Sequence, residues 1–241
     1  MIIARTLLLL SIASAVHAQS IPGAVLAVRE PHHHLAFEDS TLRVLRVRVN
    51  AHDTTLLHEH GPDYFWIALG PSTVVNAKLG APDATITSAD LSIHYTFGKF
   101  AHVARNPGAK PFDNITVELL RPQTDVRNLC ERAIADKPIG CQSPPPKADI
   151  AFSGAGVHQA FASAETRVSL VTIAPGASLK PILKSRGTWI IALDSADAGR
   201  SLVFTGDAKW VGGTARAPAG AAWRLENHGK KLVRAIAVEQ R

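Results

Sequence analysis

Residues 41–49 have the sequence TLRVLRVRV, in which apolar and polar side chains alternate. Alternation with a period of two is typical of a β-strand that has one face in a core and the other face turned away from it. The pattern returns 124 positions further along the chain, where residues 165–173 have the sequence ETRVSLVTI. Two such strands at a fixed displacement predict an internal repeat and a fold built mainly of short strands.

The match between the two halves extends beyond this strand. At the same displacement residues 67–69 align with residues 191–193, and both read IAL. Further along, the displacement falls to 121, so that residues 115–118 (ITVE) align with residues 236–239 (IAVE). We therefore predict two similar all-β domains, at residues 19–122 and 149–241, each of a normal domain size.

Residues 123–148 form the predicted linker between these domains. Its run of three prolines is expected to act as a semi-rigid spacer, and a short helical turn is expected around residues 126–135. Cys130 and Cys141 are the two cysteines of the chain. A disulfide between them would close a small loop and contribute about 3 kcal/mol in the chain-entropy model. Two free thiols are the alternative, whereas a redox-active pair is disfavoured because the spacing is not C-x-x-C.

Residues 1–18 are typical of an export signal. Arg5 supplies a positive charge, the following residues to Val16 are apolar or small, and Val16 and Ala18 occupy the −3 and −1 positions of a cleavage site. A membrane anchor is the alternative, but the apolar stretch is shorter than the roughly 20 residues that span a bilayer. We expect a mature protein that begins at Gln19, is secreted or periplasmic, and has no membrane span.

The charge pattern disfavours a nucleic-acid partner. The formal net charge is +6, but the basic residues are scattered along strand-like segments rather than clustered. Aromatic residues make up only 6% of the chain, so stacking platforms for bases are scarce. The chain also lacks the glycine-rich phosphate-binding loops and the serine-nucleophile motif of common enzyme classes. A small molecule is the expected partner, and a homodimer is a further expectation.

The segment His58-Glu59-His60 is the strongest functional signal. Two histidines at i and i+2 on a strand point to the same face, with Cα atoms about 6.6–6.8 Å apart. A third histidine, His102, opens the sequence HVARN at residues 102–106. Three imidazoles brought together by folding could hold a divalent metal. The alternative is a set of hydrogen-bonded histidines inside a core.

The second half of the chain helps to choose between these two interpretations. Of the 11 histidines, only His158 and His228 lie after residue 148. The residues that align with the three candidate ligands are Ile182, Lys184 and Trp223. The scaffold therefore does not require histidine at these positions, which favours a metal site in the first domain alone.

These motifs resemble those of the cupin superfamily in its two-domain, or bicupin, form. The first family motif is matched by residues 58–60 together with Gly70, and the second by His102 and Asn106, with FGK at residues 97–99 in place of the usual P-x-G. In the second half, residues 218–227 (PAGAAWRLEN) give the whole second motif with tryptophan in place of histidine. The resemblance covers nearly all of the mature chain. It implies an all-β fold of two double-stranded β-helix (jelly-roll) barrels in tandem, the second of them degenerate.

The resemblance also implies a metal held by His58, His60 and His102. The metal would be a divalent transition ion, iron, manganese, nickel, zinc or copper. The glutamate that completes the family's ligand set is missing, because Tyr64 and Phe65 occupy its positions. Tyr64 has the strand parity of the two histidines, so we expect it to point inward and to donate a hydrogen bond or a proton in catalysis. Asp63 is the alternative ligand if a bulge rotates it inward.

Two functions are compatible with these signals. The first is a metal-dependent enzyme of the dioxygenase, isomerase or lyase type that acts on a small organic molecule. The second is a non-catalytic binding protein for a small molecule or sugar, with a structural metal or none. The tract of three histidines at residues 32–34 is expected to cover the mouth or edge of the first barrel, although one of its side chains could support the site.

Overall fold

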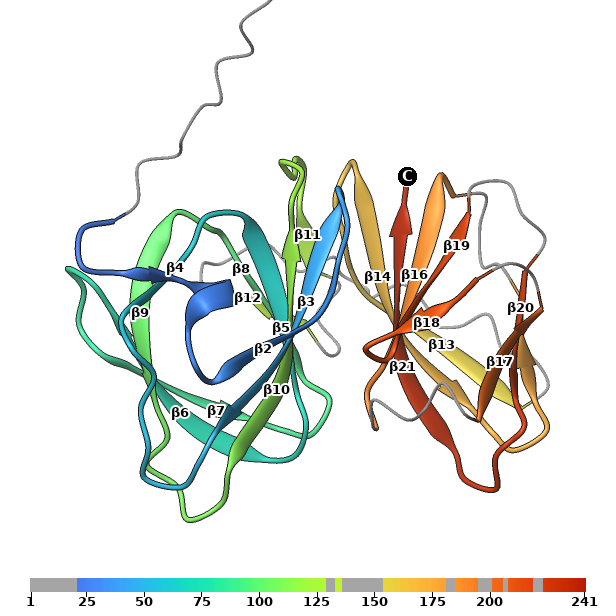
Figure 1. Cartoon of the computed structure of the whole chain (residues 1–241), viewed down its shortest axis with the longest axis horizontal. Coiled ribbons are helices and arrows are strands. Elements are labelled where there is room, and N and C mark those ends of the chain that lie inside the picture. The colour runs from blue at the N-terminus through green and yellow to red at the C-terminus, as the bar shows by residue number, and fades with distance from the viewer. Residues whose placement is uncertain are drawn as a thin grey trace, which may run out of the picture.

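The computed structural model describes residues 21–128, 133–135, 154–180, 185–194, 201–205, 208–218 and 223–241. Apart from the 3-10 helix η1 (Ala27–Arg29), regular structure in these ranges is β-strand, so the predicted all-β class is confirmed. The strands form two double-stranded β-helix barrels in tandem (Figure 1). The predicted export signal and both cysteines lie outside the described residues.

The first barrel consists of two sheets that enclose one interior. The five strands of one sheet are, in spatial order, β1 (Val25–Leu26), β4 (His58–His60), β9 (Phe100–Arg105), β6 (Ser72–Lys78) and β7 (Ala84–Ser88). The six strands of the other are β12 (Ala133–Ala135), β8 (Ile93–Thr96), β5 (Asp63–Ala68), β10 (Phe112–Leu119), β3 (Leu42–Val49) and β2 (His33–Glu38). Because β4 and β9 are neighbours, His58 and His102 are direct cross-strand partners.

The second barrel repeats this arrangement. The seven strands of its larger sheet are β11 (Arg127–Asn128), β13 (Ala155–Ala162), β14 (Thr166–Ile173), β21 (Val233–Gln240), β16 (Gly187–Ala192), β19 (Thr214–Pro218) and β18 (Trp210–Val211). The three strands of the smaller sheet are β15 (Ser178–Leu179), β20 (Arg224–Asn227) and β17 (Leu202–Thr205).

The backbone register confirms the internal repeat. In the first barrel β3 pairs with β10 so that Val49 lies opposite Phe112. In the second barrel β14 pairs with β21 so that Ile173 lies opposite Val233. These residues are related by the displacements of 124 and 121 positions found in the sequence. The two halves therefore share pairing register as well as sequence pattern.

A bulge at equivalent places strengthens this conclusion. The register of β2 on β3 shifts between Leu35 and Phe37, and that of β13 on β14 shifts between Gln159 and Phe161. Each bulge reverses which residues face the barrel interior. Its presence in both copies fixes which residues of β2 and of β13 face the interior.

The two barrels pack against each other through a shared apolar core. On β5, Phe65 and Ile67 point to the second barrel and belong to one cluster with Phe161 and Trp189. The alternate residues of the same strand point into the first barrel. The large sheet of the first barrel is thus buried on both faces, which explains why β5 is apolar at almost every position.

The helical turn expected around residues 126–135 is not found at the described positions of that segment. Arg127–Asn128 (β11) pairs with β13 of the second barrel, and Ala133–Ala135 (β12) pairs in parallel with β8 of the first. Residues 129–132 lie outside the described residues. The open edges of the two large sheets offer unpaired backbone groups, and extended chain satisfies them directly. Within the described parts of the chain, no helix has the length and apolar character needed to cross a bilayer.

Candidate metal centre

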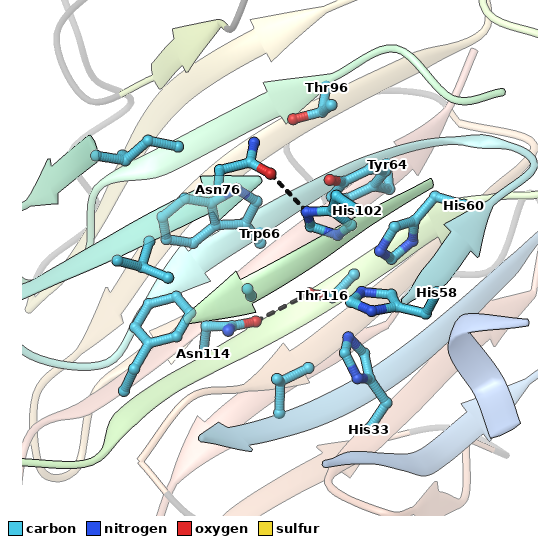
Figure 2. A pocket seen from close by; sticks show the side chains of 15 residues that line it. His33, His58, His60, Tyr64, Trp66, Asn76, Thr96, His102, Asn114 and Thr116 are labelled. Carbon is cyan, nitrogen blue, oxygen red and sulfur yellow. Dashed lines mark hydrogen bonds between the residues drawn. The ribbon is translucent and has the colours of Figure 1, made fainter. Parts of the chain in front are cut away.

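The first barrel encloses a cavity with an empty volume of about 500 Å³, including its mouth (Figure 2). Four imidazoles line it, those of His33, His58, His60 and His102. The apolar lining residues are Val47, Trp66, Val74, Ile86, Ala104 and Phe112, and the other polar ones are Tyr64, Asn76, Thr96, Asn114 and Thr116. No lysine, arginine or carboxylate is among these lining residues.

The four imidazoles gather around His58. Its ring centroid lies 4.4 Å from that of His102, 4.6 Å from that of His33 and 5.2 Å from that of His60. The ring centroids of His60 and His102 are 5.4 Å apart. The structure therefore brings the three sequence-predicted ligands together, as the pairing of β4 with β9 requires.

One histidine that the sequence did not assign forms a compact group with two of the predicted ligands. This group of candidate metal ligands is His33, His58 and His60, and it does not include His102. Ligand nitrogens of His33, His58 and His60 all lie within 4.8 Å of one another. All three side chains are buried. Figure 2 shows their rings turned toward one another at one end of the cavity, with Trp66 and Asn114 further along it.

The hydrogen bonds of His58 and His102 fix which ring nitrogen faces the cavity. Nδ1 of His58 lies 2.9 Å from the Leu56 carbonyl oxygen, and Nδ1 of His102 lies 2.6 Å from Oδ1 of Asn76. Both oxygens only accept, so each Nδ1 must carry the proton. In the neutral ring Nε2 then presents a lone pair. Both Nε2 atoms are buried and have no hydrogen-bond partner.

Buried lone pairs without a partner destabilise a folded protein, because the acceptor loses its hydrogen bonds to water and gains no hydrogen bond in their place. A bound metal ion would use both of them. The pattern of a histidine that donates from one nitrogen to an oxygen and offers the other to a metal is the usual one in metalloproteins. These residues therefore fit a metal.

His60 is held by charged and aromatic neighbours. Its Nδ1 lies 3.0 Å from Oε1 of Glu118, whose other oxygen accepts a 2.6 Å hydrogen bond from Arg43. Burial raises the pKa of the Glu118 carboxyl, and the Arg43 guanidinium opposes that rise. The Tyr64 ring stacks on His60 with centroids 4.0 Å apart and planes at 22°. The orientation of His60 is thus set on two sides.

Burial keeps the imidazoles of His58, His60 and His102 neutral at neutral pH. Burial, together with the nearby His33, lowers the pKa of His58 to about 4. Burial also places the pKa values of His60 and His102 well below the usual range. A metal ligand must be deprotonated, so at neutral pH no proton has to leave before an ion binds.

Tyr64 and Asp63 take opposite sides of β5. Tyr64 lines the cavity, as its parity predicts. Asp63 instead accepts hydrogen bonds from the Tyr95 hydroxyl at 2.6 Å and from the Gly98 backbone N–H at 2.9 Å. It is not among the residues that line the cavity, so the structure places it as a partner of the β8–β9 connection.

The histidine tract at residues 32–34 divides between two environments. His34 is exposed, as expected for a residue that covers an edge strand. His33 is buried and faces the interior opposite Val47, with which it is paired. The internal repeat held a signal for this difference, because His33 aligns with Val157, which lies in the apolar core of the second barrel.

The second barrel offers no comparable centre among its described residues. Trp223, which aligns with His102, is buried with its ring centroid 5.5 Å from that of Phe204. Ile182 and Lys184 lie outside the described residues. The other described members of the apolar core of this barrel are mainly small and branched side chains.

No family model and no curated protein matches the sequence. Solved structures with a similar fold do exist. AerE from Microcystis aeruginosa matches with a TM-score of 0.61 at 12% identity, over 88% of this chain and 93% of that one. Salicylate 1,2-dioxygenase from Pseudaminobacter salicylatoxidans matches with a TM-score of 0.52 at 11% identity, over 82% of this chain and 71% of that one.

A mutant of Bacillus subtilis oxalate decarboxylase also matches, with a TM-score of 0.52 at 13% identity, over 83% of this chain and 69% of that one. At such low identity these matches establish the fold and no more. They support the cupin-type architecture that the sequence motifs predict.

Proposed function

We propose that the first barrel is a metal-dependent enzyme acting on a small organic molecule. The observation that carries the proposal is the pair of buried Nε2 atoms on His58 and His102, which face the cavity without a hydrogen-bond partner. His58, His60 and His102 would hold a divalent transition metal. Imidazole ligands suit iron, nickel, copper and zinc, so the donor set leaves the choice among them open.

The protein would hold the metal ligands in place and shape the cavity in which the substrate binds. A bound divalent metal would act as a Lewis acid or as a binding point for an oxygen-containing group of the substrate. The hydrogen bonds to Leu56, Asn76 and Glu118 hold the three imidazoles in place. Tyr64 lines the same cavity and is the candidate donor of a hydrogen bond or proton to the substrate.

The lining of the cavity favours an uncharged or weakly charged substrate. Because no lysine or arginine lines it, a carboxylate would find no cationic partner there other than the metal. Trp66 and Phe112 meet edge to face with centroids 5.6 Å apart and form an apolar wall suited to a flat molecule. We therefore favour a small planar compound that carries one or two oxygen donors at one end.

Two of the structural neighbours are named as enzymes that act on small organic acids, a dioxygenase and a decarboxylase. This supports an enzymatic role by fold analogy alone. Dioxygenation, isomerisation and lyase chemistry remain the candidate reactions. Export to the periplasm or the medium is part of the proposal, and it is supported by the leader-like sequence of residues 1–18.

The decisive measurement is the metal content of the purified protein. We expect about one transition-metal ion per chain in the wild type and loss of that ion in the double variant His58→Ala/His60→Ala. The matched control replaces two exposed histidines, His34 and His228, by alanine and should keep the metal. Equal, sub-stoichiometric metal in the wild type and in the first double variant would refute the proposal.

A second candidate function is favoured by a specific observation. A buried fourth imidazole, that of His33, lies beside the site, and a metal saturated by protein ligands would be structural. The protein would then bind a small molecule or sugar without reacting with it. Water exchange on a bound paramagnetic ion distinguishes the two functions, because an enzyme of the proposed kind needs at least one coordination position open to solvent or substrate.

A further inference from the structure

The ligand set predicted from the sequence lacks one member. The motif that would supply a glutamate after the two histidines has Tyr64 and Phe65 there instead. Tyr64 stacks on His60 and Phe65 points into the core between the two barrels. Neither residue restores a carboxylate to the cavity.

His33 lies where it could complete the set. It comes from β2, a strand that carries none of the other candidate ligands, and the paired residue Val47 also lines the cavity. Its ring centroid is 4.6 Å from that of His58 and 6.0 Å from that of His60. A ligand nitrogen of His33 is within 4.8 Å of those of both residues.

The ring of His33 is oriented by a buried carboxylate. Nδ1 of His33 lies 2.6 Å from Oε2 of Glu30, which is 1% exposed. The carboxylate oxygen accepts, so Nδ1 donates and Nε2 is left to face the other imidazoles. A carboxylate behind the distal nitrogen of a histidine is the arrangement that makes imidazole a better metal ligand.

Glu30 also connects His33 to the strand that carries His58. Its Oε1 accepts a hydrogen bond of 3.1 Å from the backbone N–H of Leu56, and the Leu56 carbonyl oxygen holds Nδ1 of His58. His32 adds a further hydrogen bond to Glu30, 2.9 Å long. The Glu30 carboxylate is therefore fixed beside the site by several hydrogen bonds.

We infer that His33 is a fourth protein ligand of the metal, in place of the missing glutamate, and that Glu30 is its positioning residue. This inference rests on the metal centre of the proposed function, and an ion that takes five or six ligands would still have positions open to a substrate beside four imidazoles. Four neutral imidazoles leave the full charge of a divalent ion uncompensated by ligands. Such a site favours ions that prefer nitrogen, among them copper, nickel and zinc, over manganese, which prefers carboxylate.

The test is a titration of the metal-stripped full-length protein with Co(II) alone, followed by visible absorption. The d–d bands of Co(II) report the number and type of its ligands. The loss of one imidazole should therefore change the spectrum as well as the affinity. We expect one Co(II) per chain in the wild type. His33→Ala should weaken binding by about a hundredfold and change the band positions and intensity, whereas His34→Ala should match the wild type.

Two further variants separate ligation from packing. His33→Leu fills the space without a ligand atom and should behave as His33→Ala does, so it decides the question if the alanine variant does not fold. Glu30→Gln keeps the shape but removes the charge, and it should weaken binding by about ten- to a hundredfold, the range for residues that orient a ligand.

The outcomes separate this inference from the proposed function. If the wild type binds Co(II) and a folded His33 variant matches it in affinity and spectrum, His33 is not a ligand and only the present inference fails. If the wild type binds no Co(II), the metal centre itself is refuted. A spectrum that changes on His33 replacement and not on His34 replacement establishes the fourth ligand.

Discussion

The two barrels have the same backbone fold and differ in the side chains of their interiors. Asn106 in the first barrel and Asn227 in the second make equivalent hydrogen bonds. The side-chain N–H groups of each donate to two or more backbone carbonyls, and the Oδ1 of each accepts from the residue two positions later. These asparagines close equivalent turns, so this part of the second family motif serves the fold.

The interiors are where the two barrels diverge. The positions of His33 and His102 are taken by Val157 and Trp223, and both replacements belong to the apolar core of the second barrel. Equivalent positions in one scaffold thus tolerate either imidazole or apolar carbon. The comparison shows that the fold does not require histidine at these positions.

The first prediction compares residues 102 and 223, which occupy the same place in the two copies. Trp223→Ala should lower the free energy of unfolding by about 3–5 kcal/mol, because it empties a packed core, and it should leave metal affinity unchanged. His102→Ala should do the reverse. It should weaken Co(II) binding by about a hundredfold and change the stability of the metal-free protein by about 1 kcal/mol or less.

Chemical denaturation of the metal-stripped variants and Co(II) titration of the folded ones measure these two effects. A loss of metal affinity in Trp223→Ala, with the protein still folded, would mean that the second barrel takes part in the site. An unchanged affinity in His102→Ala would remove His102 from the ligand set.

The second prediction concerns acid. In the metal-free protein the pKa of His58 is lowered to about 4, against 6.5 for an unperturbed imidazole. The unfolded chain therefore binds more protons between these pH values, so stability is complete above pH 6.5 and falls as the pH drops toward 4. We expect a loss of about 3 kcal/mol from His58 alone.

Urea denaturation at a series of pH values measures this dependence. The variant His58→Leu makes this position as apolar as the interior of the second barrel and should give a visibly flatter curve between pH 4 and 6.5. A curve of the same slope in the variant and in the wild type would show that His58 does not titrate in this range.

The third prediction tests the common scaffold. Asn106→Ala and Asn227→Ala should each destabilise the protein by about 1–3 kcal/mol, because each leaves backbone carbonyls without their donors. The two losses should agree within about 1 kcal/mol, as measured by denaturation. A large loss in one variant and none in the other would show that the turns are not equivalent in energy.

The smallest expected effect comes from a sequence difference between the copies. Lys99 has a φ of 66°, in the left-handed region, and its backbone N–H donates to the His60 carbonyl oxygen at 2.7 Å. The aligned residue of the second copy is Gly220. Lys99→Gly should raise the free energy of unfolding by about 0.5–1 kcal/mol, because glycine adopts this conformation without strain. A lower melting temperature in the variant would contradict this reasoning.

The sequence predicted the repeat, the all-β barrels and the meeting of His58, His60 and His102. These features depend on short-range patterns, namely alternation, a fixed displacement and an H-x-H pair on one strand. The same reasoning gave the inward direction of Tyr64. It failed at the described residues of the 126–135 segment, where Arg127–Asn128 and Ala133–Ala135 pair as strands with the edges of two sheets.

His33 marks the boundary of what sequence alone could determine. The tract at residues 32–34 presents three identical side chains, and nothing local distinguishes them. The β-bulge at residues 35–37, the pairing of β2 with β3 and the carboxylate of Glu30 select one of the three for the interior. Glu30 lies only three residues before His33, but the bulge and the pairing depend on contacts with β3. The sequence by itself determined the scaffold and three imidazoles of its centre. Only the tertiary structure decided that His33 joins them, because the direction of its side chain depends on pairing register and on a buried partner.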